Sequence, residues 1–184
     1  MSNLLNPAFA VIARLAQRNP KGWVGRTALM KYCYFLQALR DVPLGYRFSL
    51  YSYGPFDSTV LSDLGDCEAL GIVQESATLY SVGYGYQIKS AMSDDEISRL
   101  GGAFLKDHQE AIDWVLAEFG ALAAGELELS STVVYIDQEA SDSKERLSPK
   151  ELAQRVRDVK PHFTETQVLS VTKALLDKKL LQSL

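Results

Sequence analysis

The chain has 184 residues, of which 47% are hydrophobic and 23% charged, and its formal net charge is −4 at pH 7. This length allows one domain, or one domain with a smaller appendage, to bury its own core, and the composition is that of an ordinary globular protein. No run of about 18 uncharged apolar residues would cross a membrane, and the N-terminus lacks the pattern of a secretion signal. Cys33 and Cys67 lie apart among apolar neighbours, which indicates buried free thiols. We therefore expect a cytoplasmic protein that binds no membrane.

The net charge conceals an uneven distribution along the chain. Residues 1–50 carry seven basic side chains against one acidic, a net charge of +6, whereas residues 51–100 carry two against eight, a net charge of −6. Residues 101–150 carry four against ten, which is again −6. The charge of the whole chain therefore does not decide whether nucleic acid is a partner.

The first part of the chain shows helical spacing, followed by a strand pattern. Helices are expected over about residues 6–17, which begin with an Asn-Pro cap, and over about 26–40, where apolar residues recur every three or four positions. Polar and apolar side chains alternate over residues 46–53, which predicts a short strand that Gly54-Pro55 ends. A third helix is expected over about residues 59–70.

A hairpin is expected next, with strands at residues 79–82 and 86–89 flanking a turn at Gly83-Tyr84-Gly85. Three helices followed by a hairpin are the order of a winged helix, here with an additional strand before the third helix. We therefore predict an α+β, mostly helical fold in which residues 1–92 form a winged-helix-like portion; other α+β topologies remain open.

The remainder, residues 93–184, is expected to be a helical portion, with a second helix-turn-helix-like unit as an open alternative. Capping boxes at Ser93, Ser148 and Thr164 predict the starts of three helices, the first of which covers about residues 94–120. A further helix around residues 127–139 is expected, although its STVVYI segment favours a strand by propensity.

Three segments also carry a family resemblance. The order LMKYCYFLQ, LGYRFSLYSYGPF and LSDLGDCEALGIV resembles the Panacea domain, which occurs in SocA-like antitoxins, and is similar to the YwgA-like bacterial proteins. The similarity covers about residues 27–73, and its most specific element is the YGP tripeptide at 53–55 behind a helix with Lys and aromatic residues. The resemblance implies a helical fold with winged-helix character and a role in toxin neutralisation, adaptor binding or regulation. It implies no enzymatic activity.

No catalytic residue, metal site or cofactor is expected. His108 and His162 are the two histidines of the chain, and no cysteine pair has the spacing of a zinc site. We interpret His108 as a hydrogen-bonded core histidine, because it shares an apolar helix face with Phe104. The acids at 94–96 fall in a predicted first helical turn, where capping explains them, and Gly83-Tyr84-Gly85 lacks the third glycine of a phosphate loop.

A basic patch near the turn between the first two helices is the first candidate site. It would meet an acidic protein surface or nucleic-acid phosphates, and its alternative is a solvated face without a partner. The usual winged-helix mode of DNA binding is disfavoured, because the third helix carries four acids from Asp57 to Glu68 and no Lys or Arg. The patch consists of Arg14, Arg18, Lys21, Arg26 and Lys31.

Exposed tyrosines are the second candidate, since aromatic side chains are common interface anchors. We select Tyr53, Tyr84 and Tyr86, and we interpret the YSYGPF segment first as a structural corner.

The predicted function is a noncatalytic protein-binding module, an antitoxin-like protein or regulatory adaptor, with another protein as partner. The alternative is a winged-helix DNA-binding transcriptional regulator that uses the basic patch and the hairpin. A homodimer through the C-terminal helices is a further option.

Overall fold

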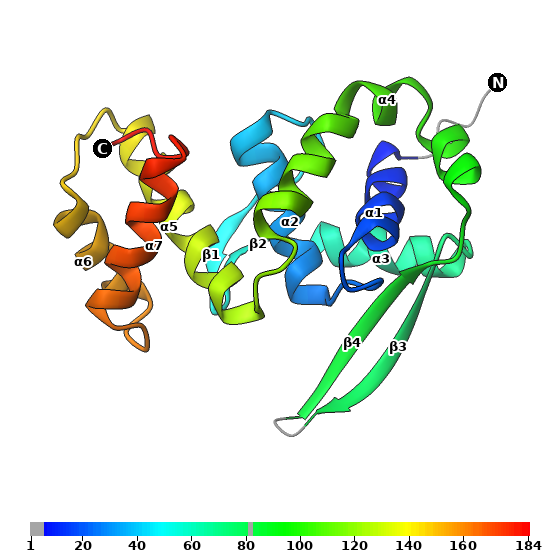
Figure 1. Ribbon diagram of the computed structural model, residues 1–184, viewed down its shortest axis with the longest axis horizontal. Coiled ribbons are helices and arrows are strands. Elements are labelled where there is room, and N and C mark those ends of the chain that lie inside the picture. Colours follow the sequence, from blue (N-terminus) through cyan, green and yellow to red (C-terminus); the bar gives the residue numbers. More distant parts are fainter. Residues whose placement is uncertain (1–5, 81–82) are drawn as a thin grey trace. The chain divides into compact units, whose positions relative to one another are not determined.

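The protein has a mostly helical α+β fold with two small antiparallel sheets (Figure 1). The structure is a computed structural model that describes residues 6–80 and 83–184. The chain forms two compact units. We call the residues up to Phe48 together with Asp57–Leu122 the N-terminal unit, and Ser49–Phe56 together with Ala123–Leu184 the C-terminal unit. Within the described ranges, no helix is both long enough and apolar enough to span a bilayer.

The helices of the N-terminal unit enclose its core. The first helix is capped as expected, because the Asn6 side chain accepts a hydrogen bond from the backbone N–H of Ala8 at 3.1 Å. Helix α4 packs along α1 and α2, and the rings of Phe35 and Phe119 stack there with centroids 4.0 Å apart. The helices are α1 (Pro7–Arg18), α2 (Arg26–Arg40), α3 (Ser58–Ala69) and α4 (Asp94–Phe119).

The fourth helix departs from the single helix expected over residues 94–120. Gly102 has a φ of 51° and a ψ of −134°, so two helical segments meet there at a kink. The preceding Gly101 packs closely on α1, since a Cβ at that position would lie 2.9 Å from the Cβ of Ala10. The paired glycines therefore allow both the close approach and the backbone break.

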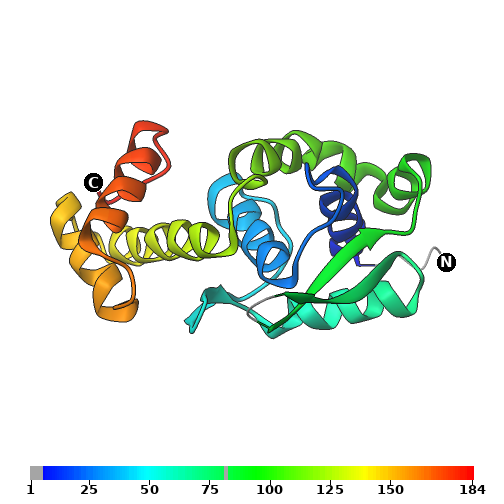
Figure 2. The same cartoon turned by 60° about the horizontal axis from the view of Figure 1, so that its bottom comes forward.

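A long hairpin completes the N-terminal unit. Strand β3 (Val73–Tyr80) pairs antiparallel with β4 (Gly83–Ser90), and the ribbon extends away from the helices of this unit (Figures 1 and 2). The expected turn at residues 83–85 was wrong: Thr78 lies opposite Gly85 and Tyr80 opposite Gly83, so these residues belong to β4. Residues 81–82, the end of the first expected strand, lie outside the described residues.

The C-terminal unit combines a short hairpin with three helices. The expected strand over residues 46–53 was only partly right, because Gly54-Pro55 does not end the sheet but begins its second strand. Gly54, with a φ of 88°, reverses the chain so that Phe56 lies opposite Ser49. The elements are β1 (Ser49–Tyr51), β2 (Gly54–Phe56), α5 (Ala124–Asp142), α6 (Pro149–Val159) and α7 (Glu165–Asp177).

The helices of the second half begin where the capping residues predicted. Ser93, Ser148 and Thr164 each form a capping box with the residue three positions later. The STVVYI segment is helical as expected, within α5, whose side chains are buried over most of its length. Burial within this unit thus overrides the β propensity of these residues.

The two units do not follow the expected division into residues 1–92 and 93–184. Helix α4 packs against α1 and α2, so it belongs to the N-terminal unit, whereas the β1–β2 hairpin packs on α5 and belongs to the C-terminal unit. The division depends on which apolar faces meet, and these contacts join segments that are distant in the sequence.

Candidate partner-binding site

The basic residues predicted to form a patch do not share an exposed surface. Arg14 and Lys31 are buried, with 2% of each residue exposed. Arg14 donates hydrogen bonds to Asp94 and, at 2.9 Å, to Ser98, both at the start of α4. The hydrogen bond from Arg14 holds the pKa of Asp94 below its usual value. Arg14, which was predicted to bind a partner, therefore makes its contacts inside the N-terminal unit.

The other three cations of the predicted patch contact groups of the same unit. Arg18 forms an ion pair with Asp113 at 2.9 Å, and the Lys21 ammonium lies 3.4 Å from the carbonyl oxygen of Leu122. Arg26 donates to both carboxylate oxygens of Glu75, and this hydrogen bonding raises its pKa. Basic and acidic segments of the sequence thus neutralise one another within the unit.

Helix α3 keeps the acidic character that the sequence predicted. Asp63 is buried, and the Tyr46 hydroxyl and the Asn6 side chain donate hydrogen bonds to it at 2.8 and 3.2 Å. Burial raises the pKa of Asp63 despite these bonds. Asp66 and Glu68 are exposed, so the surface of this helix presents negative charge.

The three predicted tyrosines are placed differently. Tyr53 is 70% exposed in the turn of the β1–β2 hairpin. Tyr86 is 38% exposed in the other unit, and the Arg26 guanidinium lies 3.6 Å from its ring centroid. The side chain of Tyr84 lies outside the described residues. Tyr51, at the end of β1, is 66% exposed and was not among the selected anchors.

A buried lysine that sequence reasoning missed holds the β1–β2 hairpin. Lys160 follows α6, and 3% of it is exposed. Its ammonium donates hydrogen bonds to the carbonyl oxygens of Tyr51, at 3.0 Å, and of Ser52. It also forms an ion pair with Glu128 of α5, whose Oε1 lies 3.1 Å from Nζ. No signal near Lys160 in the sequence pointed to this role, because its partners are Glu128 and the backbone of residues 51 and 52.

The second contact of the hairpin is a close approach of its backbone to α5. A Cβ on Gly54 would lie 3.0 Å from Ser131 Oγ, 3.1 Å from Thr132 Oγ1 and 3.3 Å from the carbonyl oxygen of Glu128. Both hydroxyls donate to that carbonyl, at 3.0 and 2.8 Å, so their positions are fixed. The glycine of the YGP tripeptide is therefore required by its positive φ and by the lack of space for a side chain.

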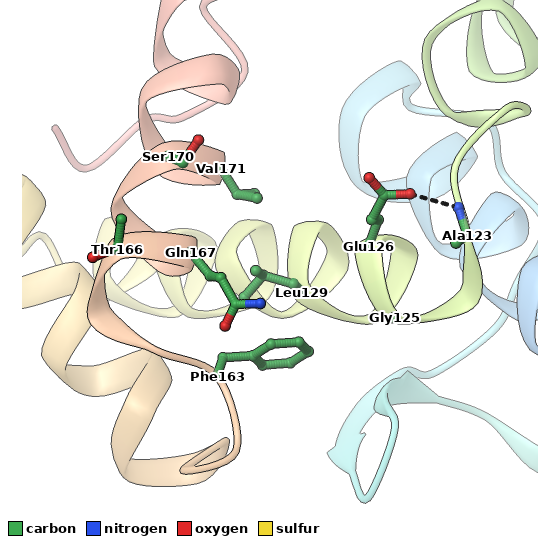
Figure 3. Close-up of a pocket in the computed structure, with 9 residues that line it drawn as sticks. All are labelled: Ala123, Gly125, Glu126, Leu129, Phe163, Thr166, Gln167, Ser170 and Val171. Carbon is green, nitrogen blue, oxygen red and sulfur yellow. Dashed lines mark hydrogen bonds between the residues drawn. The ribbon is translucent and has the colours of Figure 1, made fainter.

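A groove lies beside this cluster in the same unit (Figure 3). It has a volume of about 560 Å³, and Leu129, Phe163 and Val171 supply its apolar lining. The Phe163 ring lies 4.2 Å from that of His162, between centroids, and His162 Nε2 is 3.4 Å from Glu128 Oε1. Thr166, Gln167 and Ser170 of α7 and Glu126 of α5 add polar groups to the groove.

His108, Cys33 and Cys67 are of residue types that often take part in catalysis, but each is buried or half-buried here. His108 is not the hydrogen-bonded core residue that was expected, since it is half-buried and its ring contacts that of Phe104 at 4.6 Å. Cys33 and Cys67 are buried free thiols as predicted; burial raises the pKa of both, that of Cys67 to about 12. Within residues 6–80 and 83–184, no group of three or more His, Cys, Asp or Glu side chains is placed to hold a metal.

Comparison with known proteins does not assign a family. No protein-family model matches the chain, and no curated protein matches it.

Proposed function

We propose that this protein is a noncatalytic protein-binding module, an antitoxin-like protein or regulatory adaptor, and that the β1–β2 hairpin carries its contact surface. One observation carries the proposal: Tyr51 and Tyr53 expose 66% and 70% of their surface on a backbone that Lys160 holds from within. Aromatic side chains on a fixed backbone contribute a large contact area at low cost in conformational entropy. They are therefore suited to anchor a protein partner.

The proposed membership of the Panacea and YwgA-like group agrees with this choice of surface. The most specific element of the resemblance, the YGP tripeptide at 53–55, lies in the same hairpin. The order α1, α2, α3, β3 and β4 supports the proposed winged-helix character of the N-terminal unit. The two buried free thiols support a cytoplasmic location.

The disposition of charge favours a protein over DNA as the partner. DNA affinity depends on cations that are available to neutralise phosphates. Helix α3 contains no Lys or Arg, two residues of the predicted patch are buried, and the others contact acids or a carbonyl oxygen. The winged-helix DNA-binding regulator is thus the competing proposal, and it would have to release Arg18 and Arg26 from their carboxylates to bind phosphates.

Capture of a partner by the purified full-length chain tests the proposal. The bait would be wild type, the double variant Tyr51→Ser with Tyr53→Ser, or the control Lys150→Ser, which changes an exposed residue of the same unit. Because both tyrosines are exposed, the double variant should unfold at the same urea concentration as wild type. We expect wild type and control to retain one specific protein from an extract of the source cells, and the double variant to retain at least tenfold less. Equal retention by all three baits would contradict the proposal.

A nucleic-acid probe separates the competing proposal. Fluorescence anisotropy with a labelled random-sequence duplex would be recorded at low and at moderate salt. We expect no steeply salt-sensitive binding, because Arg18 and Arg26 pair with carboxylates and Arg14 and Lys31 are buried. Binding that weakens steeply with salt, and that disappears when Arg18, Lys21 and Arg26 are neutralised, would support the DNA-binding regulator instead.

A further inference from the structure

The turn of the β1–β2 hairpin depends on a group from outside the hairpin. Each strand has only three residues, and an isolated two-stranded hairpin of this size is marginal in water. Strand β1 is hydrogen-bonded through the backbone of Leu50 to Tyr135, and β2 contacts α5 at Gly54. Residues 51 and 52 lie between these two attachments, and Lys160 binds their carbonyl oxygens.

These two hydrogen bonds determine more than the position of the turn. A peptide unit is planar, so fixing the direction of a carbonyl group fixes the whole unit. The carbonyl groups of Tyr51 and Ser52 belong to the two consecutive peptide units on either side of the Ser52 Cα. With both units held by one ammonium, the φ and ψ angles of Ser52 are set. The relative positions of the Tyr51 and Tyr53 Cα atoms, from which the two side chains project, are set with them.

The ammonium is itself held in place. A lysine ammonium has three N–H donors, and here two of them meet carbonyl oxygens while the Glu128 carboxylate supplies the opposite charge. Lys160 is 3% exposed, and 9% of the Glu128 side chain is exposed, so solvent offers little competition for either group. Because the Lys160 ammonium is buried and paired, it stays in place and holds the backbone carbonyl groups that it binds.

We infer that Lys160 is a positioning residue for partner binding: it orders the turn at residues 51–53 and so presents the two tyrosines in one arrangement. Glu128 in turn positions Lys160. The inference rests on the proposed function, because the tyrosines matter only if they contact a partner. Its test is independent of that function, because the order of the turn is measured in the free protein.

The test removes the ammonium without leaving an unpaired buried charge. The variant Lys160→Met with Glu128→Gln keeps the apolar stem of the lysine and neutralises its partner. Backbone ¹⁵N order parameters would be measured at Ser52 and Tyr53, with α7 as the internal reference. We expect the values in the turn to fall from about 0.85, typical of rigid backbone, to below about 0.6, while those in α7 stay unchanged. The control Lys173→Met removes an exposed lysine of the same unit and should leave the turn unchanged.

Unchanged order parameters at Ser52 and Tyr53 in the double variant would overturn the inference. A purely stabilising role for Lys160 would lower the order of α7 together with that of the turn, and this result would also overturn it. If the double variant does not fold, wild type supplies the decisive measurement. The Lys160 ammonium should then show slow proton exchange and hydrogen-bond couplings to the carbonyl carbons of residues 51 and 52, and their absence would overturn the inference.

The capture experiment and the order-parameter experiment distinguish failure of the proposed function from failure of the role inferred for Lys160. If the turn loses order in the Lys160→Met, Glu128→Gln variant but the tyrosine variant still captures the partner, the proposed function is wrong, and Lys160 orders the turn without serving partner binding. If the tyrosine variant loses the partner but the turn keeps its order without Lys160, the function stands and the positioning role is wrong.

Discussion

The two hairpins of this protein reach a defined shape by different means. The β3–β4 hairpin pairs eight residues of each strand with one another, and Val24 adds a bridge to Ile88 near its base. The β1–β2 hairpin pairs three residues of each strand, and its turn is held by Lys160, which follows it by more than 100 positions. The long hairpin is therefore specified mainly by its own residues. The short one is specified by the unit around it.

The largest expected effect is the loss of the buried cation. Lys160→Met should destabilise the C-terminal unit by about 3–5 kcal/mol, because it leaves the buried Glu128 carboxylate with only the exposed His162 ring beside it. Adding Glu128→Gln should recover a substantial part of this loss, since it removes the unpaired charge. Urea unfolding followed by circular dichroism would measure both. Additive costs for the two substitutions would show that the ion pair does not couple these residues.

The corresponding ion pair of the long hairpin provides a matched control. Arg26, whose side chain is 42% exposed, pairs with Glu75 at the base of β3. Arg26→Met should cost less, about 1–3 kcal/mol: the Glu75 side chain is only 8% exposed and loses its partner, but water can replace the half-exposed guanidinium. If it cost as much as Lys160→Met, the contrast between the two hairpins would be wrong.

A smaller but still large effect is expected at the glycine of the short hairpin. Gly54→Ala should cost about 2–4 kcal/mol, because a side chain must adopt a φ of 88° and must also displace Ser131 and Thr132. Gly45→Ala is the matched control, since Gly45 has a φ of 83° but no atom within 4 Å of the added Cβ. It should cost about 1 kcal/mol. Equal costs for the two substitutions in urea unfolding would indicate that packing against α5 contributes nothing.

The smallest expected effect concerns the chain segments that flank the short hairpin. Asp57 accepts hydrogen bonds from the backbone N–H groups of Arg47, before β1, and Thr59, after β2. Burial opposes the charged form, but these hydrogen bonds outweigh it and lower the pKa of Asp57. The stabilisation is therefore fully present above the ordinary aspartate pKa of about 3.9 and is lost as the pH falls below it.

Replacement of this carboxylate should change the pH dependence of unfolding. Asp57→Asn keeps a capping side chain but cannot titrate, so the variant should be less stable at neutral pH by about 0.5–1 kcal/mol. Its disadvantage should shrink towards pH 3, where the wild-type carboxyl becomes protonated. Urea midpoints measured between pH 2.5 and 7 would test this. A constant difference over the whole range would mean that the charge of Asp57 does not contribute.

Local signals in the sequence predicted the local structure well. Asn6, Ser93, Ser148 and Thr164 mark helix starts because a capping side chain bonds to backbone groups only two or three residues away. The turn of the long hairpin was misplaced, because glycines are strong turn formers, whereas the register of the whole ladder places Gly83 and Gly85 within β4.

The candidate site was harder to predict, because its contacts connect distant positions. Arg14 and Lys31 are of residue types that usually lie on the surface, and only their burial in the structure excludes them from a surface patch. The importance of Lys160 depends on Glu128 and on two carbonyl oxygens, none of which is near it in the sequence. Tyr53 was selected because it is an aromatic residue on the expected exposed face of a strand, which is a local property.

The distance in sequence between the short hairpin and its lysine also bears on synthesis of the chain. Tyr51 precedes Lys160 by 109 positions, so a ribosome that adds about 5–20 residues per second completes the lysine roughly 5–20 s after the tyrosine. Throughout that interval the tyrosine turn leaves the ribosome without the cation that orders it. The nascent hairpin must therefore wait for Lys160, and the proposed contact surface is expected to be ordered only after this residue has been synthesised.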